Sequence, residues 1–418
     1  MDTDVAADIP ADSRTLPADR GADPSNAAAD RRILTILCLA SFLAVVNFAA
    51  PAPFFPDIAR DLGTSVPLLG QVATALTLLS ALLGLVVGPV ADRYGHRRLM
   101  IGGVAAVGLN LLGTGLAPSY PALLMLSVLG GLGDAVLFGL PLAIAGTHFV
   151  GESRRRAMSW TSAALSLGTI AGVPVLTAIG GALGWRAAIG SAGLATLGVA
   201  WLTGAWLPAT ATQPQGRFRT RALVAAYRPL LRHHPLLVLY AANGLRMACW
   251  IGLVTYLGAF LREALGFDDG WVGLAYMSGG IGAFLGSLAM GARLGRLPPR
   301  PLVAGTTATQ AVLLAAIFTL SLGTLTTLAL LPLAAFCGSA GYVGIASLLA
   351  GETPGGAATT MVLNGSVLNL GAAGGIALGG LLIAVGGYSA LGIGLPAFAL
   401  AGGLLVLVPA ASRGAPSR

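Results

Sequence analysis

Two charged residues lie alone inside long apolar stretches of the sequence, where a charge could do chemistry. Asp134 follows Gly131-Leu-Gly133, and Arg246 lies within the apolar run 236–260. Each is about 11 to 13 residues into its run, which at about 1.5 Å per residue is near the middle of a bilayer. Burying such a charge alone in hydrocarbon is costly, so both residues are candidates for a functional role.

Polar and aromatic residues in the same kind of run could line a cavity between helices. Residues three or four positions apart share one face of a helix, so Asn243 and Trp250 lie on the face of Arg246. Amides and aromatic rings with few charges suit an amphipathic or weakly polar ligand better than a highly charged one. The same side chains could instead serve only helix packing. The candidate cavity residues are Asn47, Phe138, Asn243, Trp250 and Tyr342.

The elements that must position these residues are membrane-spanning helices. The chain is 56% hydrophobic and 10% charged, with a mean hydropathy of +0.82, whereas soluble proteins carry about 25% charged residues. Runs of about 20 apolar residues are long enough to cross a hydrocarbon core of ~30 Å. The sequence predicts an all-α membrane protein with twelve transmembrane helices. The runs are 33–53, 67–89, 99–117, 121–145, 157–181, 187–207, 236–260, 271–291, 302–320, 325–349, 358–385 and 388–410.

The arginines indicate how these helices cross the membrane. All 24 basic residues are arginine. If the runs alternate, 20 arginines fall on one side, 3 on the other, and Arg246 lies within a helix. Cytoplasmic loops carry the excess of positive charge, so we expect a multi-pass protein of the cell membrane with both termini in the cytoplasm. Because the arginines lie in short connections, their charge points to topology rather than to nucleic-acid binding.

The longest break between apolar runs is rich in proline and arginine and divides the chain into two halves of six helices. The predicted segments are a disordered cytoplasmic tail (1–30), an N-terminal six-helix bundle (31–207), a cytoplasmic linker (208–235), a C-terminal six-helix bundle (236–410) and a cytoplasmic tail (411–418).

The connection between the second and third runs carries a dense motif. The stretch 88–100 contains Gly88, Asp92, Arg93, Gly95, Arg97 and Arg98. This pattern resembles the signature of the loop between helices two and three of the major facilitator superfamily of transporters. The resemblance covers roughly residues 31–410 and implies two pseudo-symmetric bundles, with this loop as a cytoplasmic gate. The alternative is that its arginines only anchor the loop on the cytoplasmic side.

A second motif lies in the fifth run. Gly168, Gly172 and Pro174, followed by Gly184-Trp185-Arg186, resemble the helix-five motif of bacterial drug:proton antiporters. Such a helix can kink and can pack tightly on the opposite half, although ordinary helix packing would also use these residues. The sequence departs from the antiporter pattern at Ser127, where helix four of such antiporters usually carries an arginine. Either Asp134 substitutes for that arginine or the coupling differs.

The resemblance also relates the two isolated charges to each other. In this superfamily helices one, four, seven and ten line a central cavity, so Asp134 and Arg246 would face each other across the two halves. A carboxyl group beside an arginine stays ionised, whereas a desolvated one without a partner binds a proton near neutral pH. Making and breaking this pair would then couple proton uptake to alternating access. The alternative is a static ion pair that fixes the packing of the halves.

The resemblance implies a proton-coupled secondary transporter that exports a small organic, drug-like molecule by alternating access. Within the same class, the alternative is a facilitator or importer of a small solute such as a sugar or carboxylate; from another class, it is a membrane-embedded sensor or enzyme. We expect a monomer in the lipid bilayer whose partners are a small-molecule substrate and protons, with no cofactor, metal or nucleotide. The sequence contains no Walker loop, HExxH or GxSxG motif, so we do not expect an enzyme.

Overall fold

The computed structural model describes residues 24–208, 228–292, 294–320, 322–351 and 357–408. The described residues form helices and no strands. In chain order these are α1 (Pro24–Ala49), η1 (Ala52–Phe54), α2 (Phe55–Asp61), α3 (Val66–Tyr94), α4 (His96–Leu116), α5 (Tyr120–Leu137), α6 (Leu140–His148), α7 (Gly151–Leu167), the π-helix η2 (Gly168–Gly172), α8 (Val173–Leu183), α9 (Trp185–Trp206), α11 (His234–Glu263), α12 (Asp269–Ala292), η3 (Leu294–Arg296), α13 (Pro299–Thr319), α14 (Thr324–Gly351) and α15 (Ala357–Leu407).

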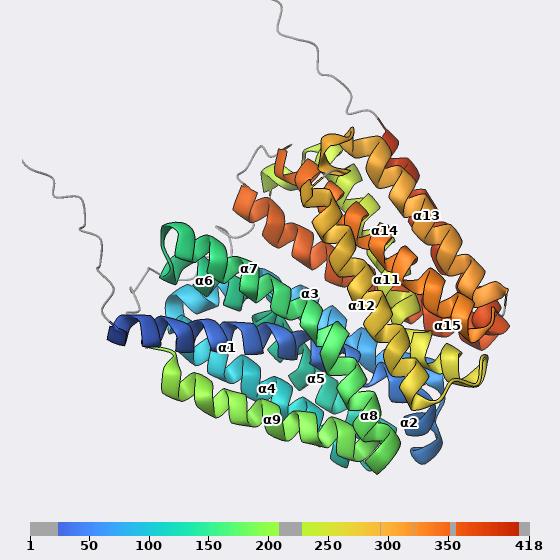
Figure 1. The fold of residues 1–418 in the computed structure, drawn as a ribbon, viewed down its shortest axis with the longest axis horizontal. Helices are drawn as coiled ribbons and strands as arrows, with labels where there is room; N and C mark the ends of the chain where they lie inside the picture. Colours follow the sequence, from blue (N-terminus) through green and yellow to red (C-terminus); the bar gives the residue numbers. More distant parts are fainter. Residues whose placement is uncertain (1–23, 209–227, 293, 321, 352–356, 409–418) are drawn as a thin grey trace, which may run out of the picture.

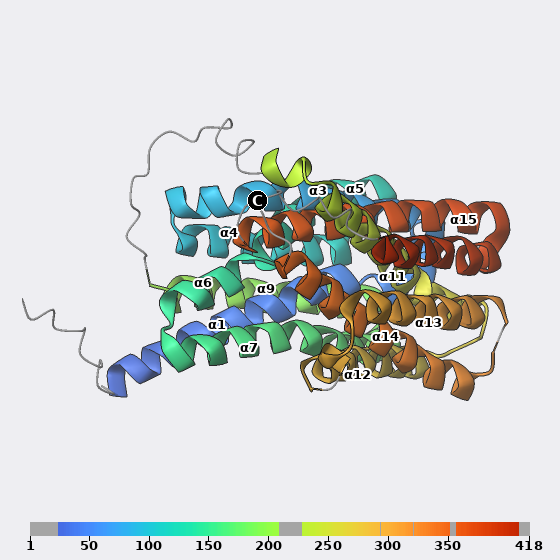
Figure 2. The same cartoon turned by 90° about the horizontal axis from the view of Figure 1, so that it is seen from above.

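These helices make twelve passes. Within the described residues, 11 helical segments are long and apolar enough to cross a membrane, and the last of them spans 45 residues. A straight helix of that length would measure more than twice the ~30 Å of a hydrocarbon core. The backbone turns back at Gly386 and Gly387, and Gly387 has a φ of +66°, which glycine adopts without strain. α15 is therefore two antiparallel helices (Figure 2), and the predicted all-α fold of twelve helices is confirmed.

The helices form two bundles, one built from α1 to α9 and the other from α11 to α15 (Figures 1 and 2). The bundles are in contact near α2 and α8, and their axes diverge toward α6. The diverging end carries the α3–α4 loop with Arg93, Arg97 and Arg98, and we call it the arginine-rich end. The opposite end, which carries α2, is called the arginine-poor end.

Several helix boundaries differ from the predicted runs. α1 begins at Pro24, inside the predicted tail, and α11 begins at His234, inside the predicted linker. The fourth run breaks at Phe138 and Gly139, because Pro141 near the start of α6 has no N–H with which to continue the helix of α5. The predicted tails at 1–23 and 411–418 and most of the linker, 209–227, lie outside the described residues.

Glycines allow α11 and the first part of α15 to approach each other closely. A Cβ atom placed on Gly371 would collide with the backbone of Gly244, and one on Gly375 with the carbonyl of Ala248. Small residues at four-residue spacing let helix backbones pack closely in lipid. This contact holds together the two helices that flank the centre of the second bundle.

The neighbouring pair Gly374 and Gly375 gives a test of this packing. We expect Gly375→Ala to destabilise the folded protein by about 1 to 3 kcal/mol, because the added methyl group overpacks a backbone contact. Gly374→Ala is the matched control, since nothing lies within 4 Å of its Cβ position. Unfolding of the purified protein by SDS measures both changes. Equal stability of the two variants would contradict the proposed close contact.

Candidate functional site

Asp134 lies in α5 at the centre of a small polar cluster in the first bundle. The residue is 1% exposed. Its Oδ1 accepts a hydrogen bond from Asn47 Nδ2 at 3.0 Å, and Asn47 Oδ1 in turn accepts one from Asn110 Nδ2 at 2.9 Å. Its Oδ2 is buried and has no hydrogen-bond partner among the described residues. We call these three residues, from α1, α4 and α5, the Asp134 cluster.

Arg246 lies in α11 at the centre of a second cluster, in the other bundle, and is 5% exposed. Its Nε donates to Thr307 Oγ1 at 2.7 Å, its Nη1 to Asn243 Oδ1 at 3.1 Å and its Nη2 to the Gly338 carbonyl at 3.0 Å. Asn243 also donates to Asn364 Oδ1 at 2.9 Å. We call this set, from α11, α13, α14 and α15, the Arg246 cluster. Neutral oxygen atoms, rather than a carboxylate, surround its guanidinium group.

The two charges therefore do not form the predicted pair in this structure. Asp134 bonds only to the amide of Asn47, and each nitrogen of Arg246 bonds to a group of its own bundle. Depth along a helix can be read from the sequence, but the direction of a side chain around the helix axis cannot. Both side chains point into their own bundle. The first, third and fourth passes supply the Asp134 cluster, and the related seventh, ninth and tenth passes supply the Arg246 cluster, to which the eleventh pass adds Asn364.

Separate clusters predict separate energetic effects. We expect Asp134→Asn and Arg246→Gln to change the free energy of unfolding additively, within about 0.5 kcal/mol, because the two residues share no partner. A double-mutant cycle of SDS unfolding measures the coupling. A coupling energy clearly above that range would show that the two residues interact in the folded protein.

A cavity of about 250 Å³ lies between the bundles. The first bundle contributes α7 and η2 to its wall, and the second contributes α11, α12 and α14. Its lining includes Ser166, Thr169, Trp250, Tyr276, Gly279 and Leu331, and it contains no charged residue. Because both bundles form it, relative movement of the bundles changes its shape.

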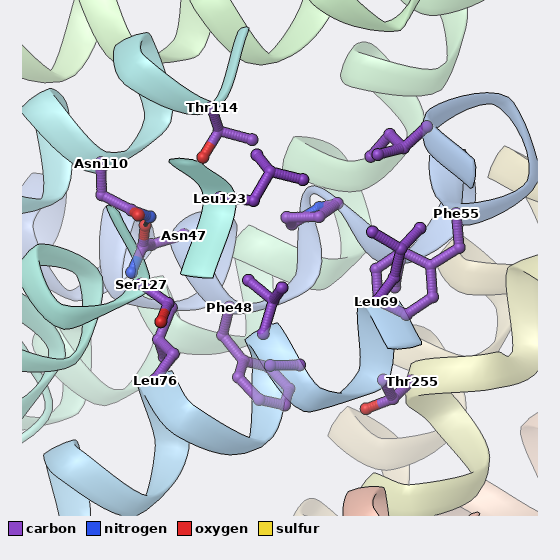
Figure 3. Close-up of a pocket in the computed structure, with 15 residues that line it drawn as sticks. Asn47, Phe48, Phe55, Leu69, Leu76, Asn110, Thr114, Leu123, Ser127 and Thr255 are labelled. Atoms are coloured by element: carbon purple, nitrogen blue, oxygen red, sulfur yellow. Dashed lines mark hydrogen bonds between the residues drawn. The ribbon is translucent and has the colours of Figure 1, made fainter. Parts of the chain in front are cut away.

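A smaller cavity of about 50 Å³ lies beside the Asp134 cluster, lined mainly by the first bundle and also by Thr255 of α11. Asn47, Asn110 and Ser127 lie close together on one side of it, and Phe55 and Leu69 lie on the other (Figure 3). Ser127 lies where the antiporter pattern has an arginine, so no charged side chain occupies this space. The cavity is large enough for water, which needs about 10 to 15 Å³ and polar partners.

The structure divides the predicted cavity residues among different places. Trp250 lines the larger cavity and Asn47 the smaller one, whereas Asn243 belongs to the Arg246 cluster. Phe138 and Tyr342 are 41% and 40% exposed and line neither cavity. Sequence reasoning missed Ser166, Thr169 and Tyr276. The signal available for the first two was their position beside the glycine–proline motif of the fifth run.

That motif forms a π-helical turn. Val173 N–H donates to the carbonyl of Gly168, five residues back, and Pro174 follows near the start of α8. Gly168 and Gly172 pack against α1 of the same bundle, because Cβ atoms there would meet Val45 and Val46 at 2.7 Å. The fifth pass does pack on α12 of the opposite half, as expected, although Gly168 and Gly172 themselves face α1. The contact with α12 of the other bundle uses glycines of α12, among them Gly273 against Thr177 and Pro174, and Gly280 against Ile170.

The α3–α4 loop turns at Gly95, whose φ of +89° lies in the region that favours glycine. Arg97 donates to the carbonyl of Gly204 in α9, so it ties the loop to its own bundle. Arg93 lies 5.4 Å from the ring of Tyr94, and Arg98 is exposed. The surroundings of Gly88 and of the Asp92 side chain lie outside the described part of the structure, and the gate stays a prediction.

An ionic cluster that the sequence did not single out joins the two bundles at the arginine-poor end. Arg262, at the end of α11, donates to Asp57 of α2 at 2.8 Å and also binds Asp269 at the start of α12. Its guanidinium carbon lies 5.8 Å from the ring centre of Phe54, and its side chain is mostly buried. We call Arg262, Asp57 and Asp269 the clasp. Only the bond to Asp57 crosses between the bundles.

One protein family matches most of the chain. The Major Facilitator Superfamily profile covers residues 37–360. The chain belongs to this family. It is therefore a multi-pass membrane protein of a transporter family.

Individual proteins resemble the chain over different lengths. The chloramphenicol resistance protein of Streptomyces lividans is 27% identical over 259 residues, which are 61% of this chain and 64% of that protein. The cephamycin export protein CmcT of Amycolatopsis lactamdurans is 35% identical over 140 residues, which are 33% of this chain and 29% of that protein. The chain thus spans less than two thirds of these two relatives. The transcription regulatory protein OpdE of Pseudomonas aeruginosa is 27% identical over 386 residues, 90% and 93% of the two chains.

A solved structure shares the arrangement of the whole chain. A bacterial homologue of the human lysosomal transporter Spinster, in an inward-facing and occupied conformation, superposes with a TM-score of 0.71. The match covers 94% of this chain and 96% of that chain at 18% identity. At this identity the likeness establishes the superfamily fold, with its two bundles, and nothing about the substrate.

Proposed function

We propose that this superfamily member is a proton-coupled exporter of a small, drug-like organic molecule. The observation that carries the proposal is the buried carboxyl group of Asp134, which has one amide donor, one unpartnered oxygen and no cation beside it. An ionised carboxylate in such a place is strongly disfavoured unless it is paired or fully hydrogen-bonded. The neutral, protonated acid fits these surroundings. A conformational change that hydrates or pairs Asp134 would release the proton.

The direction and substrate class rest on the relatives and the cavity. Two relatives are named for resistance to, or export of, antibiotics. Among the described residues, the lining of the cavity between the bundles is mainly apolar and includes no charged residue, which suits a drug-like molecule better than a sugar or a charged carboxylate. The glycine–proline turn of the fifth pass, which separates α7 from α8, agrees with the antiporter resemblance.

Further parts of the proposal concern orientation, assembly and gating. We infer that the arginine-rich end and both termini face the cytoplasm, because this end carries most of the positive charge. The transporter works as a monomer, with Asp92 and its loop as the cytoplasmic gate. The orientation is tested in intact cells with two variants, each carrying a single cysteine, at position 98 or at position 183, in place of Arg98 or Leu183. If a membrane-impermeant thiol reagent labels only the cysteine at position 183, the arginine-rich end faces the cytoplasm.

Reconstitution in liposomes tests the function. The purified protein is incorporated with a pH dye inside, and chloramphenicol, cephamycins, sugars and carboxylates are added one at a time. We expect an antibiotic-dependent change of internal pH that requires the protein. Solute flux without a pH change would indicate a facilitator. Proton-coupled uptake of a sugar or carboxylate would indicate an importer. The absence of flux for every solute would favour a sensor.

A further inference from the structure

The cavity between the bundles is lined in part by polar side chains that have no hydrogen-bond partner among the described residues. Hydroxyl groups on these helices commonly donate to a carbonyl of the preceding turn, as Thr161 does to Ala157 at 2.8 Å and Thr177 to Pro174 at 2.9 Å. Ser166 and Thr169 line the cavity, and neither side chain makes a hydrogen bond within the described part of the chain. Both hydroxyl groups are therefore available to a ligand.

The π-helical turn adds an acceptor at the same place. Val173 N–H bonds the carbonyl of Gly168, so the next residue would bond the carbonyl of Thr169 in the same register. That residue is Pro174, which has no N–H. The carbonyl of Thr169 consequently lacks its helical donor. Thr169 thus offers both a hydroxyl group and an unpaired carbonyl beside the cavity.

The opposite wall carries two aromatic side chains, Trp250 and Tyr276. Trp250 lines it with an indole N–H that bonds to none of the described residues. The hydroxyl group of Tyr276 is already used, since it donates to the carbonyl of Val254 at 3.0 Å, so this residue offers mainly its ring. Gly279 and Gly280 of α12 also line the cavity and have no side chains to fill it. A planar ring system fits against such a surface.

The lining residues also indicate which ligand charge the cavity can accept. No acidic or basic residue lines the cavity, and Arg246 directs its nitrogen atoms to Thr307, Asn243 and Gly338. The rings of Trp250 and Tyr276 could attract a cation, but such attraction is weaker than the cost of removing an unpaired ion from water. A neutral molecule avoids this cost and can satisfy the free hydroxyl, carbonyl and indole groups.

We propose that this cavity, which we call the inter-bundle site, binds an uncharged aromatic compound that carries a hydroxyl, amide or carbonyl group. Ser166 and Thr169 recognise the polar group, and Trp250 and Tyr276 hold the ring. The volume of about 250 Å³ limits the ligand to one or two fused rings with a short side chain. This inference rests on the proposed function only in regarding the ligand as a transported substrate.

Indole derivatives that differ in one group provide the test. Tryptophol is neutral, tryptamine is a cation and indoleacetate is an anion at neutral pH, while ethylindole lacks the hydroxyl group. Saturation-transfer NMR titrations with the purified full-length protein give a dissociation constant for each probe without any proton gradient. We expect tryptophol to bind at least about tenfold more tightly than either ion.

Variants then assign the contacts. Ser166→Ala and Thr169→Val should each weaken tryptophol binding by about two- to tenfold and leave ethylindole binding unchanged, because only tryptophol has the hydroxyl group. Gly279→Leu should abolish binding of both by filling the cavity, since a Cβ at Gly279 meets Leu331 at 3.7 Å. Gly198→Leu in α9 is the size-matched control, because nothing lies within 4 Å of its Cβ position.

Three outcomes would overturn the inference. The first is an ion that binds as tightly as tryptophol. The second is an equal loss of affinity for tryptophol and ethylindole in Ser166→Ala and Thr169→Val, and the third is unchanged binding of both probes in Gly279→Leu. The proposed function is judged separately, by the pH change in liposomes. Neutral-selective binding without proton flux would retain the inter-bundle site and reject the antiporter. Proton-coupled export by a protein that binds the ions as tightly as tryptophol would support the antiporter and reject the inter-bundle site.

Discussion

Replacement of Asp134 with asparagine is expected to abolish transport driven by a pH gradient. The amide is nearly the same size and can keep the contact with Asn47, but it cannot take up and release a proton. Exchange of substrate in both directions without a gradient should continue, because the fold and the cavity between the bundles are unchanged. Liposome flux with and without an imposed pH gradient measures both properties.

Two controls separate coupling from damage to the fold. Asp134→Glu keeps a carboxyl group and should retain part of the coupled flux. Asn110→Ala removes the outer amide of the same cluster, so it should reduce coupling less than the loss of the carboxyl group. Normal gradient-driven transport in Asp134→Asn would show that Asp134 is not the residue that binds and releases the coupled proton.

Replacement of Arg262 with alanine is expected to open the arginine-poor end. The variant loses the bond to Asp57 that joins the bundles and leaves that carboxylate near Asp269 without a shared cation. Because these groups are only partly buried, we estimate a loss of about 1 to 3 kcal/mol for the closed arrangement. Such a loss shifts the balance of open and closed forms by about 5- to 150-fold.

Spin labels measure this shift directly. Leu183 in α8 and Leu320 after α13 are exposed positions at the arginine-poor end, one in each bundle, and can carry the labels as cysteines in a background without the native ones. Arg262→Ala should increase the population with long distances between the labels. Arg60→Ala is the matched control, because Arg60 binds the same Asp57 at 3.3 Å but its side chain is 75% exposed. An unchanged distance distribution in Arg262→Ala would mean that apolar packing alone closes this end.

The sequence predicted those features that depend on the solvent and on one helix at a time. A bilayer requires apolar runs of about 20 residues, so hydropathy alone located the twelve passes, including the two that α15 joins through Gly386 and Gly387. The motif around Gly95 identified the family, because that loop needs a glycine with positive φ between two helices.

The tertiary structure decided what depends on rotation about a helix axis and on the meeting of distant helices. Asp134 and Arg246 lie at similar depth, yet each points into its own bundle and bonds to neutral groups there. The partners of Arg262 are 205 and 7 positions away in the sequence, so no local pattern could reveal the clasp. The cavity between the bundles, with Ser166 and Thr169 on one wall and Trp250 on the other, exists only because two separate six-helix units meet. Apolar periodicity fixes which segments enter the membrane, whereas packing between segments fixes which side chains meet.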